Sequence, residues 1–157
     1  MKVEKPTLKE VSQIQKLVNS YARKGFLLPR SLPDIYESIR EFFVVKDGSE
    51  VAAAGALKIF WEDLAEIRSL AVDEKYRGQG LGRELVDACF REAMELGVKK
   101  VFVLTNTPEY FSRLGFYSVD RKDLPQKVWS DCLKCPKFPD CDEVPLMIDM
   151  DSLELDG

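Results

Sequence analysis

A glycine-rich turn in the middle of the chain constrains the fold more than any other feature. It follows the apolar run 67–72 and opens an amphipathic segment over residues 81–96. The turn consists of Arg77, Gly78, Gln79, Gly80, Leu81 and Gly82. Glycines leave the backbone N–H groups at a helix start unobstructed, and the helix dipole adds positive potential there. The order of strand, glycine turn and helix therefore predicts a phosphate-binding turn, with a simple helix-capping turn as the alternative.

The spacing of the glycines excludes two common nucleotide-binding motifs. A dinucleotide-binding fold needs G-x-G-x-x-G in its first strand–helix unit, and a nucleoside triphosphate loop needs G-x-x-x-x-G-K-[ST]. Neither pattern occurs in this sequence. The phosphate expected at the turn therefore belongs to another carrier.

Length and composition indicate one globular domain. The chain has 157 residues, of which 45% are hydrophobic and 32% charged, and we assign residues 1–150 to the domain and 151–157 to a loose C-terminal tail. A formal net charge of −4 provides no basic field for nucleic acid or an anionic membrane. The sequence shows neither a secretory signal nor a run long enough to span a membrane, so we expect a cytoplasmic protein. The oligomeric state stays open, a homodimer included.

Histidine is absent, and this restricts the available chemistry. The absence excludes a histidine triad, a histidine general base and the commonest zinc ligand. Three of the four cysteines, Cys132, Cys135 and Cys141, lie in a late loop with metal-like spacing. A tetrahedral zinc site needs four ligands, so we predict no metal and a reduced loop, with structural zinc as the alternative.

The hydrophobic pattern predicts an α/β fold. A capping box at Thr7–Glu10 opens a helix whose apolar positions run from residue 8 to 21, and Ser31 caps a second, short helix. Periodicity and glycine positions predict the remaining helices at 81–96 and 108–114. Strands are expected at 3–5, 42–46, 51–60, 65–72, 101–104, 116–119 and 144–150, the fourth and fifth side by side.

The pattern Arg77-x-x-Gly80-x-Gly82, with a preceding Leu-Ala-Val strand end and a later Asn106 and Leu-Gly-Phe turn, resembles the GNAT superfamily of acetyl-CoA-dependent N-acetyltransferases. The resemblance implies a single domain whose mixed central sheet has two splayed parallel strands and is flanked by helices. It also implies that acetyl-CoA is the cosubstrate and that the loop amides cradle its pyrophosphate. The residues implied to bind the coenzyme are Leu70, Ala71, Val72, Arg77, Gly78, Gln79, Gly80, Leu81, Gly82, Arg83, Asn106 and Phe111.

The same resemblance implies a catalytic set. Glu66 occupies the place where many members of the superfamily carry a general base, and a strand N–H at Leu70 would polarise the thioester carbonyl. The tyrosine that protonates the leaving thiolate in many members is replaced by Phe111, and Tyr110 stands one residue earlier. Thiolate protonation is therefore assigned to Tyr110, with water or no assistance as alternatives. Glu66 could also be an ordinary strand-end carboxylate, and Asn106 a helix cap.

A narrower similarity, over residues 26–125, is to the acetyltransferase domain of bacterial N-acetylglutamate synthase. It rests on Leu27-Leu28-Pro29-Arg30-Ser31, Ala56-Leu57-Lys58, the strand from Glu66 to Val72, Phe111 and Leu124-Pro125. By this similarity Arg30 and Lys58 would hold the carboxylates of L-glutamate, and acetyl transfer to its α-amine would begin arginine biosynthesis by direct attack. The alternatives are an acetyltransferase for protein N-termini or another small amine, and a non-catalytic acetyl-CoA-binding module.

Overall fold

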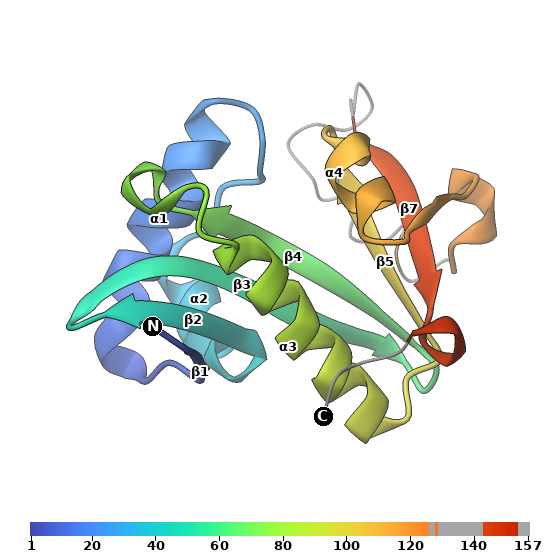
Figure 1. Ribbon diagram of the computed structural model, residues 1–157, viewed down its shortest axis with the longest axis horizontal. Coiled ribbons are helices and arrows are strands. Elements are labelled where there is room, and N and C mark those ends of the chain that lie inside the picture. The colour runs from blue at the N-terminus through green and yellow to red at the C-terminus, as the bar shows by residue number, and fades with distance from the viewer. Residues whose placement is uncertain (126–127, 129–142, 154–157) are drawn as a thin grey trace.

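The computed structural model describes residues 1–125, 128 and 143–153, which form a seven-stranded sheet with helices on both faces (Figure 1). The strand order is β1-β2-β3-β4-β5-β7-β6, and of the described pairs only β4 and β5 run parallel. The strands are β1 Val3–Glu4, β2 Phe42–Asp47, β3 Glu50–Trp61, β4 Leu64–Val72, β5 Lys100–Thr105, β6 Tyr117–Ser118 and β7 Val144–Asp149. This is the predicted mixed α/β sheet.

Within residues 1–125 and 143–153, the structure has four α-helices and five 3₁₀ turns besides the strands. The α-helices are α1 Val11–Arg23, α2 Leu32–Glu37, α3 Leu81–Leu96 and α4 Pro108–Arg113. The 3₁₀ turns are η1 Leu8–Glu10, η2 Ile39–Glu41, η3 Glu74–Tyr76, η4 Arg121–Asp123 and η5 Met150–Ser152. Across the described part of the chain, none of the helices combines the length and the hydrophobicity needed to cross a membrane.

The first helix buries one side against the sheet, as its apolar spacing predicts. The Thr7 backbone N–H donates to Glu10 Oε1 at 2.8 Å, and the Thr7 side chain accepts from the Lys9 N–H, which confirms the capping box. The first turn is the separate 3₁₀ turn η1, so the α-helix begins only at Val11. Its buried residues pack with Ile35 of α2 over one face of β2 and β3. The loop that joins these two helices lines the cleft of the candidate active site.

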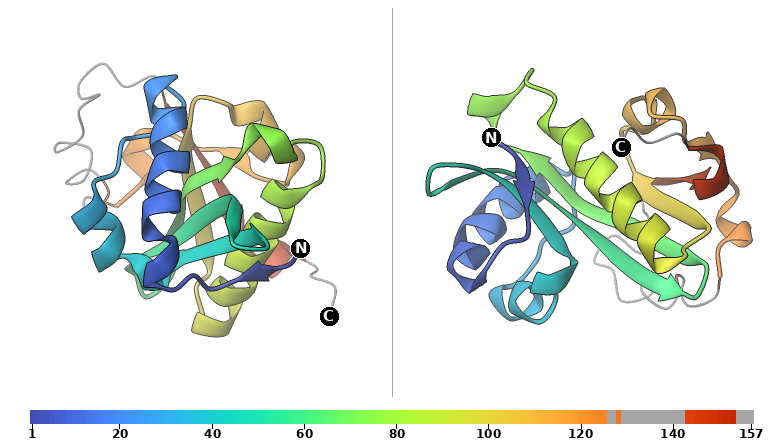
Figure 2. Two further views of the ribbon diagram at one scale, coloured as in Figure 1. Left: turned by 90° about the vertical axis from the view of Figure 1, so that its left-hand side faces the viewer. Right: turned by 60° about the horizontal axis from the view of Figure 1, so that its bottom comes forward.

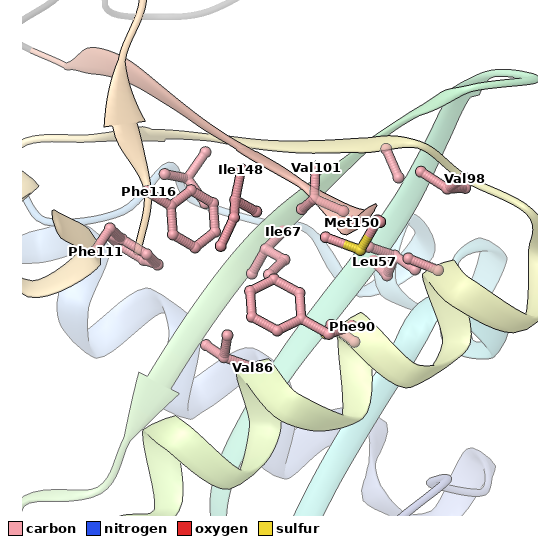
Figure 3. Packing of buried hydrophobic residues seen from close by; sticks show 14 of the residues in the cluster. Leu57, Ile67, Val86, Phe90, Val98, Val101, Phe111, Phe116, Ile148 and Met150 are labelled. Atoms are coloured by element: carbon pink, nitrogen blue, oxygen red, sulfur yellow. The ribbon is translucent and has the colours of Figure 1, made fainter. Parts of the chain in front are cut away.

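Helix α3 covers the opposite face of the sheet (Figures 1 and 2). Its apolar stripe buries Val86 and Phe90 against Ile67 of β4 and the aromatic pair Phe111 and Phe116 (Figure 3). Gly97 ends the helix with a φ of +83°, the left-handed conformation that glycine adopts without strain. The long central helix is thus fixed along its whole length, and its N-terminus is held in place at the end of β4.

The two parallel strands diverge after only three paired residues. Leu64, Ala65 and Glu66 of β4 pair with Lys100, Val101 and Phe102 of β5. Beyond that point β4 continues to Val72 and β5 to Thr105, and the views show the strands spreading apart (Figures 1 and 2). The predicted splay of the two strands is confirmed.

The C-terminal third departs from the predicted bounds. The strand expected at 116–119 is the two-residue β6, and the strand expected to end at residue 150 ends at Asp149 because Met150 starts η5. Met150 packs into the core beneath α3. Cys132, Cys135 and Cys141, together with tail residues 154–157, lie outside the described residues.

Candidate active site

A large cleft occupies the space where β4 and β5 diverge. Its volume is about 1350 Å³, which suits a cosubstrate and an acceptor together. Residues 67–72 of β4 and 103–105 of β5 form its floor, and the glycine turn, the loop between α1 and α2, and α4 supply its walls. Because the β4–β5 ladder ends at Glu66, the rest of β4 presents a backbone edge to this cleft. Leu70, Ala71 and Val72 lie on that edge.

The glycine turn forms the end of the cleft nearest α3. Gly78 and Gly80 have φ values of +81° and +77°, and Gly80 is the N-cap of α3. Since Gly80 has no side chain to cap the helix, the first-turn N–H groups are left for an external acceptor. Gln79 is exposed and is not among the described residues that line the cleft, whereas the other five predicted turn residues and Arg83 do line it.

Two arginines and a tyrosine surround this turn. Arg77 donates to the Tyr21 hydroxyl at 3.2 Å, and that hydroxyl donates to the Val72 carbonyl at 2.5 Å. Arg83 pairs with Asp87 one turn along α3 at 3.1 Å. These contacts tie α1 to the end of β4, and they place two cationic side chains in the cleft lining beside the glycine turn.

Tyr110 and Phe111 start from neighbouring positions of α4 and differ in environment. Phe111 is buried in the core against Phe116, with ring centroids 5.5 Å apart. The Tyr110 hydroxyl lies over the start of α3, because a Cβ added at Gly82 would be only 2.7 Å from that oxygen. Burial raises the pKa of the Tyr110 hydroxyl, with a smaller opposing effect from Arg83. The structure thus brings Tyr110 to the glycine turn.

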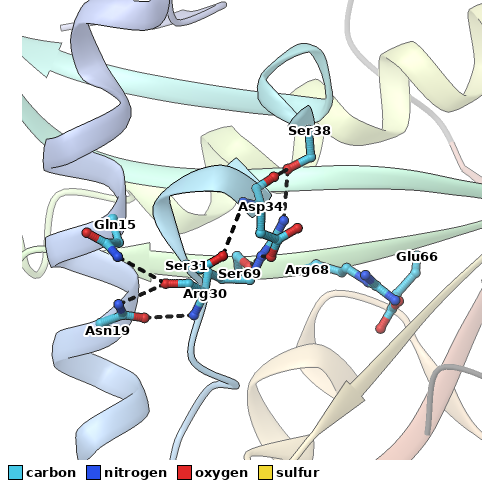
Figure 4. A network of polar contacts seen from close by, with 9 residues as sticks. All are labelled: Gln15, Asn19, Arg30, Ser31, Asp34, Ser38, Glu66, Arg68 and Ser69. Atoms are coloured by element: carbon cyan, nitrogen blue, oxygen red, sulfur yellow. Dashed lines mark hydrogen bonds and ion pairs between the residues drawn. The ribbon is translucent and has the colours of Figure 1, made fainter. Parts of the chain in front are cut away.

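Glu66 lies at the point where β4 and β5 separate. Its side chain lines the cleft, is 8% exposed and forms an ion pair with Arg68 at 2.5 Å (Figure 4). Lys58 is its cross-strand neighbour on β3. Val72, which like the Tyr110 hydroxyl lies beside Gly82, is six positions further along β4 than Glu66, roughly 20 Å at the usual rise. Glu66 and the Tyr110 hydroxyl therefore belong to different ends of the cleft.

Arg30 is held rigidly in the cleft wall that the loop between α1 and α2 forms. Its guanidinium donates to Ser69 Oγ and Ser38 Oγ, both at 2.9 Å, and forms an ion pair with Asp34 (Figure 4). Its backbone is fixed as well, because the Arg30 N–H donates to Asn19 Oδ1 at 2.9 Å. The side chain is 10% exposed and lines the cleft. Lys58 lines the same region, with its ammonium 5.1 Å from the centre of the Phe60 ring.

Ser69 marks a β-bulge in the strand beside Arg30. Between the pairs Ala56–Arg68 and Ala54–Ala71, one residue of β3 faces two of β4. Ser69 has a φ of +55°, the only positive φ among the described non-glycine residues. Such a conformation costs roughly 1–3 kcal/mol and persists where surrounding contacts enforce it. The bulge turns the Ser69 hydroxyl toward Arg30.

Two cleft cations were missed by the sequence analysis. Arg68 follows Glu66 by two residues on β4, so the period of a strand predicts that both side chains lie on the same face of the sheet. Arg121 reaches the cleft from η4 and donates to the backbone carbonyl of Glu143, whose residue also lines the cleft. No local sequence pattern connects Arg121 with Lys58, because these two residues of the cleft lining are far apart in the sequence and come into one cleft only in the folded protein.

Asn106 lies at the end of β5 beside the cleft. Its Nδ2 donates to the carbonyl of Gly25 at 2.8 Å, which links the loop after α1 to the loop before α4. Asn106 is not among the described residues that line the cleft, and Thr107, not Asn106, is the N-cap of α4. A contact between Asn106 and the coenzyme stays a prediction.

Cys89 is the one cysteine among the described residues, and it is fully buried on α3. This burial raises the pKa of the Cys89 thiol to about 12, so the thiol is not ionised at neutral pH. In the described part of the chain no three His, Cys, Asp or Glu side chains are grouped as metal ligands would be. The described residues therefore provide neither a thiolate nucleophile nor a metal centre.

A helix that starts at a glycine turn, beside two strands splayed around a cleft, defines an α/β protein that binds a phosphate-bearing ligand between strands. The chain belongs to the acetyltransferase (GNAT) family, whose model matches residues 11–118, more than half of its length. It is therefore an acetyl-CoA-dependent N-acetyltransferase, and the resemblance seen in the glycine motif is confirmed.

Two proteins with similar sequences indicate a more specific class of acetyltransferase. The chain is 40% identical over 145 residues to an uncharacterized N-acetyltransferase of Chlorobaculum tepidum, covering 92% of this chain and 94% of that protein. It is 36% identical over 132 residues to an amino-acid acetyltransferase of Mycobacterium tuberculosis, covering 82% and 75%. The protein is thus related to amino-acid acetyltransferases.

Two solved structures share the fold closely. The N-acetylglutamate synthase of Neisseria gonorrhoeae, complexed with coenzyme A and N-acetyl-glutamate, superposes with a TM-score of 0.87 and 25% identity over 94% of this chain, which spans about a third (34%) of that longer chain. A Mycobacterium tuberculosis protein in complex with CoA and NLQ gives a TM-score of 0.80 and 30% identity, with 94% and 98% covered.

Proposed function

We propose that this acetyltransferase acts on the α-amine of an amino acid, and that L-glutamate is its acceptor. The observation that carries the proposal is the cationic end of the cleft, where Arg30 is fixed by Asp34, Ser38 and Ser69 beside Lys58. An acceptor with two carboxylates needs such donors in a protein whose net charge is −4. Proteins with related sequences are named amino-acid acetyltransferases, which supports the same acceptor class.

Arg30 suits a carboxylate because its guanidinium is oriented before any ligand arrives. Its contacts with Asp34, Ser38 and Ser69 use three of the five N–H groups, which leaves two further N–H groups for a ligand. A fixed planar fork recognises a carboxylate with little loss of side-chain freedom. Lys58, across the β3–β4 pair from Glu66, offers a point charge for the second carboxylate.

The opposite end of the cleft suits the diphosphate part of the cosubstrate. The first-turn N–H groups of α3, with Arg77 and Arg83 alongside, would bind the pyrophosphate. The open backbone edge at Leu70, Ala71 and Val72 would pair with the amide groups of the pantetheine arm. In this arrangement a strand N–H at Leu70 would hold the thioester carbonyl, which bound acetyl-CoA supplies for attack by an amine.

The side chains that line the cleft are suited to direct transfer of the acetyl group from acetyl-CoA to the acceptor amine. Glu66 would accept a proton from the acceptor ammonium, and the freed amine would attack the acetyl carbonyl as the carbon–sulfur bond breaks. The buried Cys89 cannot act as an acyl carrier. Tyr110 would donate a hydrogen bond near the glycine turn, so we assign it to binding of the coenzyme arm and to a proton relay rather than to the acceptor.

A thiol-release assay tests the proposal. Acetyl-CoA would be supplied with L-glutamate, glutamine, aspartate, ornithine or lysine, for the unmodified protein, Arg30→Ala and Arg40→Ala. Arg40 is an exposed arginine of η2 that does not line the cleft, so it is the matched control. We expect glutamate-selective turnover that falls at least tenfold in kcat/KM in Arg30→Ala and is unchanged in Arg40→Ala.

Two outcomes would end the proposal. Turnover that is indifferent to glutamate, or equal in the two arginine variants, would mean that Arg30 does not select the acceptor. Coenzyme binding without turnover on any amine would instead identify a non-catalytic binding module.

A further inference from the structure

Arg68 lies next to the proposed general base Glu66 and has no role in the transfer reaction proposed above. It follows Glu66 by two residues on β4, so the two side chains share one face of the sheet, and Arg68 Nε lies 2.5 Å from Glu66 Oε1 (Figure 4). Both side chains line the cleft, with Glu66 8% and Arg68 27% exposed. The pair therefore lies within reach of an acceptor and is partly shielded from water.

An aromatic ring holds the cationic heads at this place. The guanidinium carbon of Arg68 lies 5.4 Å from the centre of the Phe60 ring, and the Lys58 ammonium lies 5.1 Å from the same centre. Phe60 is itself buried against Phe102 of β5, with centroids 5.5 Å apart. Arg68 and Lys58 are thus neighbours on a rigid apolar base.

Other charged groups share the cleft with this pair or act on it from η2. Glu41 of η2 interacts electrostatically with Lys58, Arg68 and Arg30, and its own pKa is raised by burial despite these cations. The charged residues that line the cleft together with Glu66 are Arg30, Asp34, Lys58, Arg68, Arg77, Arg83, Arg121 and Glu143. Among these, Arg68 makes the 2.5 Å contact with Glu66.

We propose that Arg68 is a positioning residue that couples acceptor binding to the strength of the base Glu66. In the free enzyme Arg68 holds Glu66 as a carboxylate aimed into the cleft. When an amino acid binds, the carboxylate held by Lys58 also contacts the Arg68 guanidinium beside it, and Glu66 becomes a stronger base as the amine arrives. The inference rests on the proposed function, because it needs an acceptor that carries a carboxylate.

The physical basis is competition for one cation. A cation beside a carboxylate favours the charged form and makes it a weaker base, by about 1–3 pH units for a close arginine. When a second carboxylate binds the same guanidinium, Arg68 stabilises the charged form of Glu66 less, so the pKa of Glu66 rises. Glu66 can then take one proton from the acceptor ammonium, and the freed amine forms the new nitrogen–carbon bond. The thiolate released by carbon–sulfur cleavage takes the second amine proton, and Glu66 returns its proton to water.

The test compares two pH profiles, since kcat/KM reports the free enzyme and kcat reports the enzyme with its acceptor bound. In the unmodified protein we expect the acidic limb of kcat/KM to have its midpoint about one pH unit below that of kcat. In Arg68→Gln the kcat/KM midpoint should rise by about one unit, so that the two limbs coincide. Arg68→Lys should keep the two limbs apart, and Arg113→Gln, an exposed arginine of α4 outside the cleft lining, should match the unmodified protein.

A titration without turnover gives an independent measurement. Carbon-13 NMR of protein labelled at glutamate carboxyl groups, with Glu66→Gln for assignment, follows Glu66 directly, and no histidine is present in the chain to titrate nearby. Its midpoint should rise when coenzyme A and N-acetyl-L-glutamate are added to the unmodified protein. The midpoint should not respond in Arg68→Gln.

The outcomes separate the two proposals. Coincident limbs in the unmodified protein, or no change on replacing Arg68, would overturn this inference while glutamate turnover leaves the proposed function standing. If the ion pair were only structural, Arg68→Gln would raise both midpoints by the same amount and added ligand would leave the Glu66 midpoint of the unmodified protein unchanged, which also overturns the inference. Absence of turnover on every amino acid would overturn both.

Discussion

Replacing Gly82 with alanine probes the contact between α3 and α4 at the glycine turn. The added Cβ would lie 2.7 Å from the Tyr110 hydroxyl oxygen, 3.7 Å from Tyr110 Cζ and 3.7 Å from Val72 Cγ2. Since a relaxed contact is about 3.5 Å, the hydroxyl must withdraw by roughly 0.8 Å. The ring is packed edge-on against Phe111, so this movement disturbs the core. The remaining two contacts are ordinary van der Waals distances and cost nothing.

The expected free energies follow from these distances. Overpacking costs about 1–3 kcal/mol, while alanine gains roughly 0.5–1 kcal/mol over glycine within a helix. Gly82→Ala should therefore lower the free energy of unfolding by about 1 kcal/mol. In the Tyr110→Phe background the hydroxyl is gone, so the same change should be neutral or slightly stabilising. The difference between the two backgrounds is a coupling of about 1–2 kcal/mol.

Urea unfolding of the four proteins in this cycle measures that coupling. Fluorescence of the two tryptophans provides the signal, and equal m values would show that only stability has changed. Additive effects, with Gly82→Ala equally costly in both backgrounds, would refute the placement of the Tyr110 hydroxyl over α3. Coenzyme A titrations on the same proteins would then show whether the displaced hydroxyl also weakens binding at the turn.

Three further substitutions test separate features. Ser69→Gly removes the strain of a positive φ, whereas Ser69→Ala keeps it, so urea unfolding should find the alanine variant less stable by about 1 kcal/mol; equal stabilities would contradict the bulge. Burial raises the pKa of Glu41 above its ordinary value of 4.5, so the folded state binds the carboxyl proton more tightly than the unfolded state. The free energy of unfolding therefore falls as the pH rises from 4.5 through the raised pKa of the folded state. Glu41→Gln should thus have a higher Tm than the unmodified protein at pH 7 and no advantage below pH 4.5, and an advantage independent of pH would contradict the burial argument. Asn106→Ala removes the 2.8 Å bond to Gly25, and faster amide hydrogen exchange confined to residues 25–30 is expected; unchanged exchange would show that the bond does not restrain this loop.

The central strand, glycine turn and helix could be predicted because their signals are local. Gly80 and Gly97 bracket α3 as caps, and the apolar spacing between them specifies which face is buried. The divergence of β4 and β5 came from the family resemblance alone. Its position at Glu66 depends on pairing between residues far apart in the sequence, which no local pattern encodes.

The acceptor end of the cleft was predicted only in part, for the same reason. Arg30 and Lys58 were found through short motifs, but Arg121 enters from a segment about sixty residues beyond Lys58. Arg68 was accessible to strand periodicity, because it follows Glu66 by two residues and therefore lies on the same face of β4, but it was not among the predicted site residues. The location of the Tyr110 hydroxyl required the packing of α4 against α3, which the sequence does not specify.

A competition experiment tests the central claim most directly. The protein would receive limiting acetyl-CoA and an equimolar mixture of glutamate, glutamine, aspartate, ornithine and lysine, and mass spectrometry of the products would give relative kcat/KM values from a single reaction. The proposed clamp of Arg30 and Lys58 predicts N-acetylglutamate as the main product, acetylated on the α-amine, and loss of this preference in Arg30→Ala. A main product from an acceptor without a second carboxylate, or acetylation of a side-chain amine, would contradict the assignment of this cleft.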